Sequence, residues 1–190
     1  MFTGIVQAVG RIVRLSPLEI ESGSLDLSGV AAGDSICVQG VCLTVTALTN
    51  CGFTADVSAE TLAVTAGLDR QGEVNLEKAV RMGESIGGHL VTGHVDGVGE
   101  VVRHEGSVYA IRLPASLARY VARKGSICID GVSLTVNRVE AEVFEVNLIP
   151  HTLEVTTLSR LAPESKVNLE IDLIARYVER YLSTAQTGPK

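Results

Sequence analysis

Two side chains stand out as candidates for chemistry, Cys42 and His94. A thiol that solvent can reach can add to an electrophile, and histidine is the side chain most readily poised to take a proton near neutral pH. Cys42 occupies a position that the chain repeats with a hydroxyl, at Ser133, which favours a reactive and accessible thiol. The alternative is a structural cysteine, because cysteine is among the most often buried residues.

His94 ends a glycine-rich run, residues 87–94, and stands where an earlier copy of the same segment has Ile5. Glycine lets the backbone approach a flat ligand closely, and a histidine there could act as a general base. His89, in the same run, is better explained as a hydrogen-bonded structural histidine. The two histidines would face opposite sides of a continuous strand, and no carboxylate or cysteine completes a ligand set. We therefore expect no metal site.

Small hydrogen-bonding side chains accompany Cys42. Side chains alternate along a strand, so Cys42 and Thr44 share one face, and Ser133 and Thr135 repeat the arrangement. Such a pair on an otherwise apolar strand suits a planar, polar ligand lying against the sheet. The alternative is a hydroxyl bonded to neighbouring backbone, as is common for a single Ser or Thr. Because the pair occurs twice, we favour ligand binding.

An internal duplication sets the positions of all these residues. Residues that differ between the copies then mark where the two halves do different work, as at Cys42 opposite Ser133 and at His94 opposite Ile5. Four blocks recur in the same order: 3–14 with 92–103, 35–45 with 126–136, 60–65 with 151–156, and 74–77 with 167–170.

Each half has the pattern of an all-β unit. Its apolar segments are short, rich in Val, Ile, Leu and Thr, and separated by Gly, Asp, Asn or Ser. A small unit of short strands must bury one face and protect its edges, and closure into a barrel does both. We predict two tandem barrels, at residues 1–87 and 88–170.

The clearest helical periodicity follows the second unit, within residues 171–190. A helix there could fold back on its own barrels or pack against copies of itself, and the sequence favours neither. The residues after it, 183–190, are expected to be disordered. The apolar positions at three-to-four spacing are Ile171, Ile174, Tyr177, Val178, Tyr181 and Leu182.

Composition excludes several classes of protein. The chain of 190 residues is 46% hydrophobic and 20% charged, as expected of a globular protein rather than a disordered one. A net charge of −6, scattered cations and 4% aromatic residues argue against nucleic-acid binding. The sequence contains no P-loop, no Rossmann fingerprint and no G-x-S-x-G turn, so no nucleotide cofactor is indicated.

The same sequence indicates a cytoplasmic protein. We see no signal peptide and no apolar run long enough for a membrane helix. The four cysteines are too few for a disulfide scaffold and form no C-x-x-C pair, so reduced thiols are expected.

Four motifs, at residues 1–6, 40–45, 87–97 and 130–136, resemble the riboflavin synthases of the α-chain type, and the resemblance covers almost the whole chain. It implies two six-stranded Greek-key barrels followed by a trimerisation helix. It also implies a transferase that converts two molecules of 6,7-dimethyl-8-ribityllumazine into riboflavin and 5-amino-6-(D-ribitylamino)uracil, without a cofactor. One departure is Gln39, where the family often has Asn.

The resemblance further implies a homotrimer in which each barrel binds one lumazine. The reaction centre would form where the N-terminal barrel of one subunit meets the C-terminal barrel of another. Carried over by position, the N-terminal pocket comprises Gly4, Ile5, Val6, Ser35, Cys42, Leu43, Thr44, Asp56, Val57, Ser58, Ala59, Glu60 and Thr61. The C-terminal pocket comprises Gly93, His94, Val95, Lys124, Ser133, Leu134, Thr135, Asn147, Leu148, Ile149, Pro150, His151, Thr152 and Asp172.

Within these pockets, Cys42, His94, Ser35, Ser133 and Thr135 are the expected catalytic residues. His94 would assist proton transfer, and Cys42 with Ser35 would support addition to the partner ring. The competing class is a lumazine- or flavin-binding protein of the same fold without activity, whose members lose the reactive residues. Because Cys42 and His94 are retained, the enzyme is favoured. A purely structural double barrel would leave the differences between the two halves unexplained.

Overall fold

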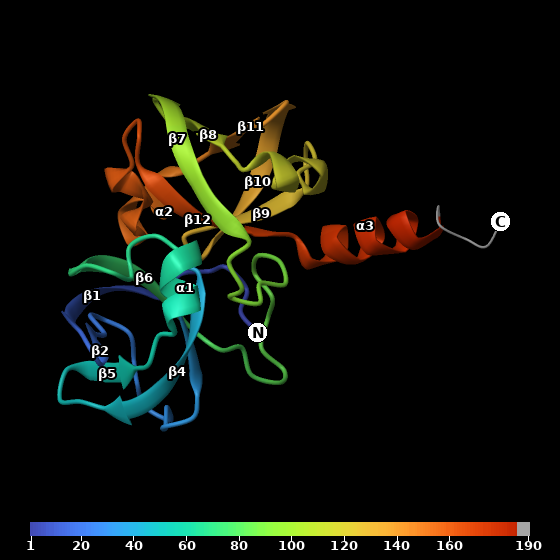
Figure 1. Ribbon diagram of the computed structural model, residues 1–190. Coiled ribbons are helices and arrows are strands. Elements are labelled where there is room, and N and C mark those ends of the chain that lie inside the picture. Colours follow the sequence, from blue (N-terminus) through green and yellow to red (C-terminus); the bar gives the residue numbers. More distant parts are fainter. Residues whose placement is uncertain (186–190) are drawn as a thin grey trace.

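The computed structural model describes residues 1–185 and contains two closed antiparallel barrels, one above the other in Figure 1. The strands of the first follow one another in the order β1-β2-β5-β4-β3-β6 around the barrel. A short helix, α1 (Ala59–Val64), lies between β5 and β6. The strands are β1 (Ala8–Leu15), β2 (Leu18–Glu21), β3 (Ser35–Val38), β4 (Val41–Leu48), β5 (Gly52–Ala55) and β6 (Gly72–Lys78).

The second barrel repeats this order strand for strand, which confirms the predicted pair of duplicated six-stranded barrels. Three short helices accompany it, η1 (Ala115–Tyr120), α2 (Pro150–Val155) and η2 (Thr157–Arg160). Its strands are β7 (Gly97–Glu105), β8 (Val108–Arg112), β9 (Ser126–Ile129), β10 (Val132–Glu140), β11 (Val143–Asn147) and β12 (Lys166–Ile171). Residues 79–96 connect the barrels, and the predicted boundary between 87 and 88 falls inside this connection.

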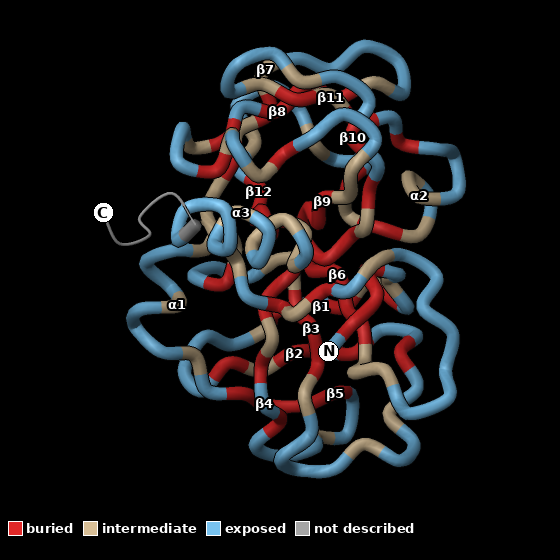
Figure 2. The backbone as a smooth tube through the Cα atoms, turned by 90° about the vertical axis from the view of Figure 1, so that its right-hand side faces the viewer, coloured by how far each residue is buried: buried red, intermediate tan, exposed pale blue. Residues whose placement is uncertain are grey.

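Each barrel has its own core, and a third cluster lies between the barrels. Alternation along the strands sends one set of side chains inward, so the buried backbone in Figure 2 follows the strands. The third cluster consists of Phe2, Cys37, Val91 and Cys128, all almost fully buried. Cys37 and Cys128, which match in the repeat, are therefore packing residues, as expected. All four cysteines of the chain are free.

The two halves meet around an approximate twofold axis within one chain. The tight turns Gln39-Gly40 and Asp130-Gly131 touch there, and a Cβ added to Gly40 would lie 2.9 Å from the Gly131 nitrogen. Asn75 Nδ2 donates to the Asp130 carbonyl over 2.8 Å, and Asn168 Nδ2 donates to the Gln39 carbonyl over 2.9 Å. These reciprocal bonds fix how the barrels are oriented toward each other.

Helix α3 (Leu173–Ala185) extends away from both barrels (Figure 1). The prediction that it begins at Ile171 was wrong, because Ile171 is the last residue of β12 and its side chain is buried in the second core. Residues 183–185, predicted to be disordered, belong to this helix, and residues 186–190 lie outside the described part of the chain. None of the helices in residues 1–185 combines the length and apolar character needed to cross a membrane.

Candidate functional site

The polar pairs predicted on β4 and β10 lie on the outer faces of the two barrels. Cys42 and Ser133 are half-buried and Thr44 and Thr135 are exposed, whereas the apolar residues between them point into the cores. Ser35 on β3 pairs directly with Thr44, so it stands on the same outer face. The structure thus brings Ser35, Cys42 and Thr44 together on the first barrel.

Turns from the opposite half cover both surfaces. The Cys42 nitrogen donates to the Gly93 carbonyl, and the Ser133 nitrogen donates to the Gly4 carbonyl, each over 2.8 Å. A Cβ added at Gly93 or at Gly4 would lie 2.6 Å from the Cβ of its partner, so only glycine permits this approach.

The expected division of residues between the two pockets therefore needs one correction. Residues 4–6 were assigned to the first barrel, but Gly4 contacts Ser133 and Val6 packs against the core of the second barrel. Conversely, Val95 packs against the core of the first barrel. The two turns are exchanged between the halves, so each outer face carries residues from both halves of the repeat.

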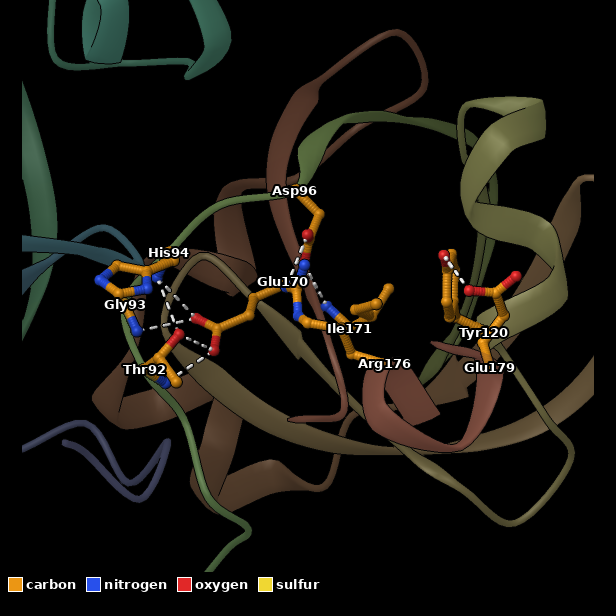
Figure 3. Close-up of polar contacts among 9 residues, drawn as sticks. All are labelled: Thr92, Gly93, His94, Asp96, Tyr120, Glu170, Ile171, Arg176 and Glu179. Carbon is orange, nitrogen blue, oxygen red and sulfur yellow. Dashed lines mark hydrogen bonds and ion pairs between the residues drawn. The ribbon is translucent and has the colours of Figure 1, made fainter. Parts of the chain in front are cut away.

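Two buried carboxylates hold these turns in place. Glu170 accepts hydrogen bonds from the Thr92 nitrogen and hydroxyl, over 2.6 and 2.8 Å, and from the Gly93 nitrogen over 2.8 Å (Figure 3). Glu77 accepts the equivalent bonds from Thr3 and Gly4. Burial raises the pKa of both glutamates above the ordinary value, against the lowering effect of these hydrogen bonds.

Sequence reasoning did not include Glu77 and Glu170 in the site. The available signal was their repeated block, Val-Asn-Leu-Glu, in which a carboxylate recurs near the end of a strand. A buried charge needs a set of donors nearby, and the turns at residues 3–4 and 92–93 are polar segments that recur together with it.

His94 is exposed and follows directly after the Gly93 contact with Cys42. Its backbone nitrogen donates to Glu170 over 3.1 Å, which leaves the imidazole ring free of that carboxylate (Figure 3). Ile5, at the equivalent place in the first half, lines a cavity of about 280 Å³ together with Thr3 and Glu77. The adjoining cavity, of about 360 Å³, is lined by Ser35 and the charged groups of Asp34, Lys78 and Arg81.

The remaining predicted residues lie in matching loops after β5 and β11. Ser58 caps α1 by accepting from the Thr61 nitrogen over 3.0 Å, and Val57 packs against the first core. Asn147 accepts from the Ser107 hydroxyl over 2.6 Å. The exposed residues among them are Asp56, Ser58, Ala59, Glu60, Asn147, Ile149, Pro150 and His151, and Thr61 and Thr152 are half-buried.

Other members of the predicted set take different positions. Leu43, Leu134 and Leu148 point into the barrel cores, so only their backbone can face a ligand outside. Lys124 is exposed and adopts a left-handed backbone, φ +68°, at the place where the first half has Gly33. Asp172 is half-buried and accepts from the Ile174 nitrogen at the start of α3.

The first turns of α3 are fixed to the second barrel by charged groups. Arg176 pairs with Asp96 over 2.7 Å, and Glu179 accepts from the Tyr120 hydroxyl (Figure 3). Glu179 also pairs with Arg119 over 3.0 Å. The apolar residues on the other side of the helix are more than half exposed, namely Ile174, Tyr177, Val178, Tyr181 and Leu182. Helix α3 therefore does not bury its apolar face on its own barrels.

Comparison with known proteins agrees with the duplicated architecture. Residues 3–79 and 92–172 each match the lumazine binding domain family. The chain is 48% identical to riboflavin synthase from Mycobacterium tuberculosis, over 97% of this chain and 100% of that protein. The chain belongs to the riboflavin synthase family. Two further members are 45% identical in Photobacterium leiognathi, over 96% of this chain and 89% of that protein, and 40% identical in Bacillus subtilis, over 97% and 91%.

This chain also resembles solved structures of LumP, a protein crystallised with bound ligands. LumP complexed with riboflavin is 27% identical, with a TM-score of 0.80 over 90% of this chain and 99% of that one. LumP complexed with 6,7-dimethyl-8-(1'-D-ribityl) lumazine is 26% identical, with a TM-score of 0.78 over 90% and 98%. The domain match and the riboflavin synthase relatives confirm the family inferred from the motifs.

Proposed function

We propose that this protein is a riboflavin synthase. It transfers a four-carbon unit between two molecules of 6,7-dimethyl-8-ribityllumazine and releases riboflavin and 5-amino-6-(D-ribitylamino)uracil, the last step of riboflavin formation. One substrate loses what the other gains, so the reaction is a dismutation that requires no external oxidant, and no cofactor is included in the proposal. In class the enzyme is a transferase.

One observation carries the proposal: the protein repeats one outer surface and changes its chemistry at the centre. On both barrels a glycine turn from the opposite half lies against the second residue of a strand. That residue is a thiol on the first barrel, Cys42, and a hydroxyl on the second, Ser133. Two like surfaces suit two copies of one substrate, and their difference suits unlike roles in the reaction.

The proposed roles follow from what each side chain can do. His94, exposed beside the first surface, takes a proton from the acidic ring methyl of one lumazine. Cys42, with Ser35 on the same face, supports addition to the partner ring, and Ser133 and Thr135 bind on the second barrel. Holding two rings in register supplies much of the rate enhancement.

The proposal includes a homotrimer in which the N-terminal barrel of one subunit faces the C-terminal barrel of another. The exposed apolar face of α3 supports assembly, because contiguous apolar surface of this kind usually marks an interface. A cytoplasmic location is part of the same proposal, and the four free cysteines fit a reducing compartment.

The alternative is a carrier that holds a lumazine or a flavin without changing it. The likeness to LumP favours this reading, but at 26% and 27% identity it is weaker than the 40–48% identity to riboflavin synthases. The retained Cys42 and His94 also favour the enzyme.

Incubation of the purified protein with the lumazine as the sole substrate separates the two functions. An enzyme converts it, so flavin absorbance grows with time. A carrier shifts the lumazine spectrum on mixing and then leaves it unchanged, which would contradict the proposal.

A further inference from the structure

Cys37 and Cys42 face each other across the hairpin formed by β3 and β4. They are partners in the strand register, one pair away from the turn. The turn residues Gln39 and Gly40 both have positive φ, 51° and 86°, as in a two-residue turn of type I′. In such a hairpin the pair next to the turn is hydrogen-bonded and the following pair is not. Cys37 and Cys42 therefore form a non-hydrogen-bonded pair, and the Cys42 nitrogen donates outside the hairpin, to the Gly93 carbonyl.

This kind of pair can be joined by a disulfide. The side chains of a non-hydrogen-bonded pair point to the same side of the sheet, and their Cα atoms are about 4.5 Å apart. A disulfide requires Cα atoms separated by roughly 4.4–6.8 Å. Cys42 packs against the buried cluster that contains Cys37, and both thiols are free in the structure. The backbone of the hairpin thus has the spacing that a bond between the two sulfurs needs.

The two thiols differ in how they meet solvent. Cys42 is half-buried on the outer face of the candidate site, whereas Cys37 is only 2% exposed, between the barrels. Burial raises the pKa of Cys37 well above its usual value, and the neighbouring carboxylates of Glu77 and Glu170 add to this effect. Cys37 therefore stays protonated and out of reach of a dissolved oxidant, so Cys42 is the sulfur that such an oxidant meets first.

The second barrel has the same packing without the same pair. There Cys128 is the register partner of Ser133, so a hydroxyl stands where the first barrel has its second thiol. Cys128 nevertheless packs in the same buried cluster as Cys37. The packing role of Cys37 can therefore be separated from the role of its thiol, with Cys128 as the matched residue.

We propose that Cys37 is a resolving thiol for Cys42, and that the two form a reversible disulfide when a peroxide oxidises the outer face of the first barrel. The Cys42 sulfur attacks hydrogen peroxide, takes up one oxygen atom and releases water, which leaves a sulfenic acid. The Cys37 sulfur then attacks the Cys42 sulfur, so that the S–S bond forms, the S–O bond breaks, and the oxygen leaves as water with the Cys37 proton. Together the two sulfurs lose the two electrons that reduce the peroxide.

The bond has two consequences for Cys42. It withdraws the thiol from the reaction, a consequence that rests on the proposed function. It also stops oxidation at a stage that a dithiol reverses, whereas an unresolved sulfenic acid proceeds to the irreversible sulfinic and sulfonic acids.

Peroxide oxidation of the full-length chain, with Cys51→Ala as the parent chain, tests the pair. After alkylation of the remaining thiols in denaturant, trypsin leaves Cys37 and Cys42 together in the peptide of residues 15–70 and Cys128 in another peptide. The first peptide should lack two hydrogen atoms and carry no alkyl group, and the peptide of Cys128 should be fully alkylated. Turnover should fall by about tenfold or more, and dithiothreitol should restore it.

Two variants of the parent chain separate the thiol of Cys37 from its packing. In Cys37→Ala, turnover before oxidation should match the parent chain. After peroxide its Cys42 has no partner, so the peptide should gain two or three oxygen atoms and dithiothreitol should not restore turnover. Cys128→Ala loses the equivalent packing, and it should form the disulfide and recover as the parent chain does.

A disulfide between Cys37 and Cys128 would overturn the proposal, as would oxygen addition at Cys42 in the parent chain with Cys37 still alkylated. Full recovery of Cys37→Ala with dithiothreitol after the same treatment would also contradict it. A chain that forms the bond between Cys37 and Cys42 but makes no riboflavin would contradict the proposed function and support this inference.

Discussion

The backbone nitrogen of Cys42 donates a hydrogen bond to the Gly93 carbonyl over 2.8 Å, which joins the candidate nucleophile of one half to a turn of the other half. The turn carries His94 as its next residue. Cys42 and His94 are therefore placed by a contact between halves, although about fifty residues separate them in the chain. Anything that pushes the turn away should disturb both residues at once.

Gly93→Ala should have this effect. The new Cβ would lie 2.6 Å from the Cys42 Cβ, and the backbone at Gly93 is left-handed, with φ +79°. We expect a loss of about 3 kcal/mol in the free energy of unfolding, together with most of the turnover. Gly106→Ala is the matched control, because Gly106 also has positive φ but nothing within 4 Å of an added Cβ. It should cost only about 1 kcal/mol. If the two variants lost equal free energy of unfolding in urea, the close contact between Gly93 and Cys42 would be contradicted.

Cys42→Ala and His94→Gln should lower kcat by roughly tenfold to a hundredfold each, because general acid–base and nucleophilic assistance are lost while positioning of the rings remains. Cys51→Ala is the control: Cys51 is exposed and precedes β5, so the turnover of this variant should match that of the wild type. Steady-state rates measure all three variants. Unchanged turnover in both Cys42→Ala and His94→Gln would rule out the assigned roles.

Much of the fold was predictable because it is encoded locally and then repeated. Alternation along β4 and β10 placed Cys42 and Ser133 on an outer face, and the matched blocks required two copies of one barrel. The exchange of the turns was not predictable, because contacts such as Gly4 with Ser133 carry no local signal. The start of α3 was missed because Ile171 fits a helical period and a buried strand equally well.

The candidate site was predictable only in part. Residue types pointed to Cys42 and His94, but the contact between His89 and Ser133 is visible only in the three-dimensional structure. Likewise, Glu77 and Glu170 were visible as a repeat, yet their role depends on donors more than seventy residues away.

Asp130 should make the stability depend on pH. Burial raises its pKa from 3.8 to about 7, against hydrogen bonds from Asn168 and Gln39 that lower it. Because the folded state holds this proton more tightly than the unfolded state, stability falls as pH rises from about 4 to about 7 and is then level. Between pH 5.5 and pH 7.5 the titration of Asp130 alone should lower the free energy of unfolding by about 2 kcal/mol. Glu77 and Glu170, whose pKa values are also raised, act in the same direction.

Asp130→Asn removes the Asp130 contribution. In urea unfolding, the free energy of unfolding of the variant should rise by about 2 kcal/mol relative to that of the wild type between pH 5.5 and pH 7.5. Asp69→Asn, at an exposed position, is the control and should follow the wild type. If Asp130→Asn and wild type change in parallel with pH, Asp130 does not titrate in this range.

Tyr177→Glu combined with Tyr181→Glu should prevent assembly. Both side chains are exposed on the apolar face of α3, so charges there leave the fold of one chain intact but oppose burial against other copies. Sedimentation velocity should give a trimer for the wild type and a monomer for the double variant. Arg180→Glu, on the polar side of the helix, should remain trimeric. A trimeric, fully active double variant would remove α3 from the interface.

The central claim is that one reaction centre forms from unlike barrels of two different subunits, and complementation tests it most directly. Thr44→Trp and Thr135→Trp place the same bulk on the exposed outer face of the first and the second barrel, respectively. Each variant alone should be inactive. Co-expressed in equal amounts, they should recover about a quarter of wild-type turnover, because random assembly pairs an unblocked first barrel with an unblocked second barrel in that fraction of interfaces. Failure of the mixture to recover activity, while each variant is trimeric, would contradict a site shared between subunits.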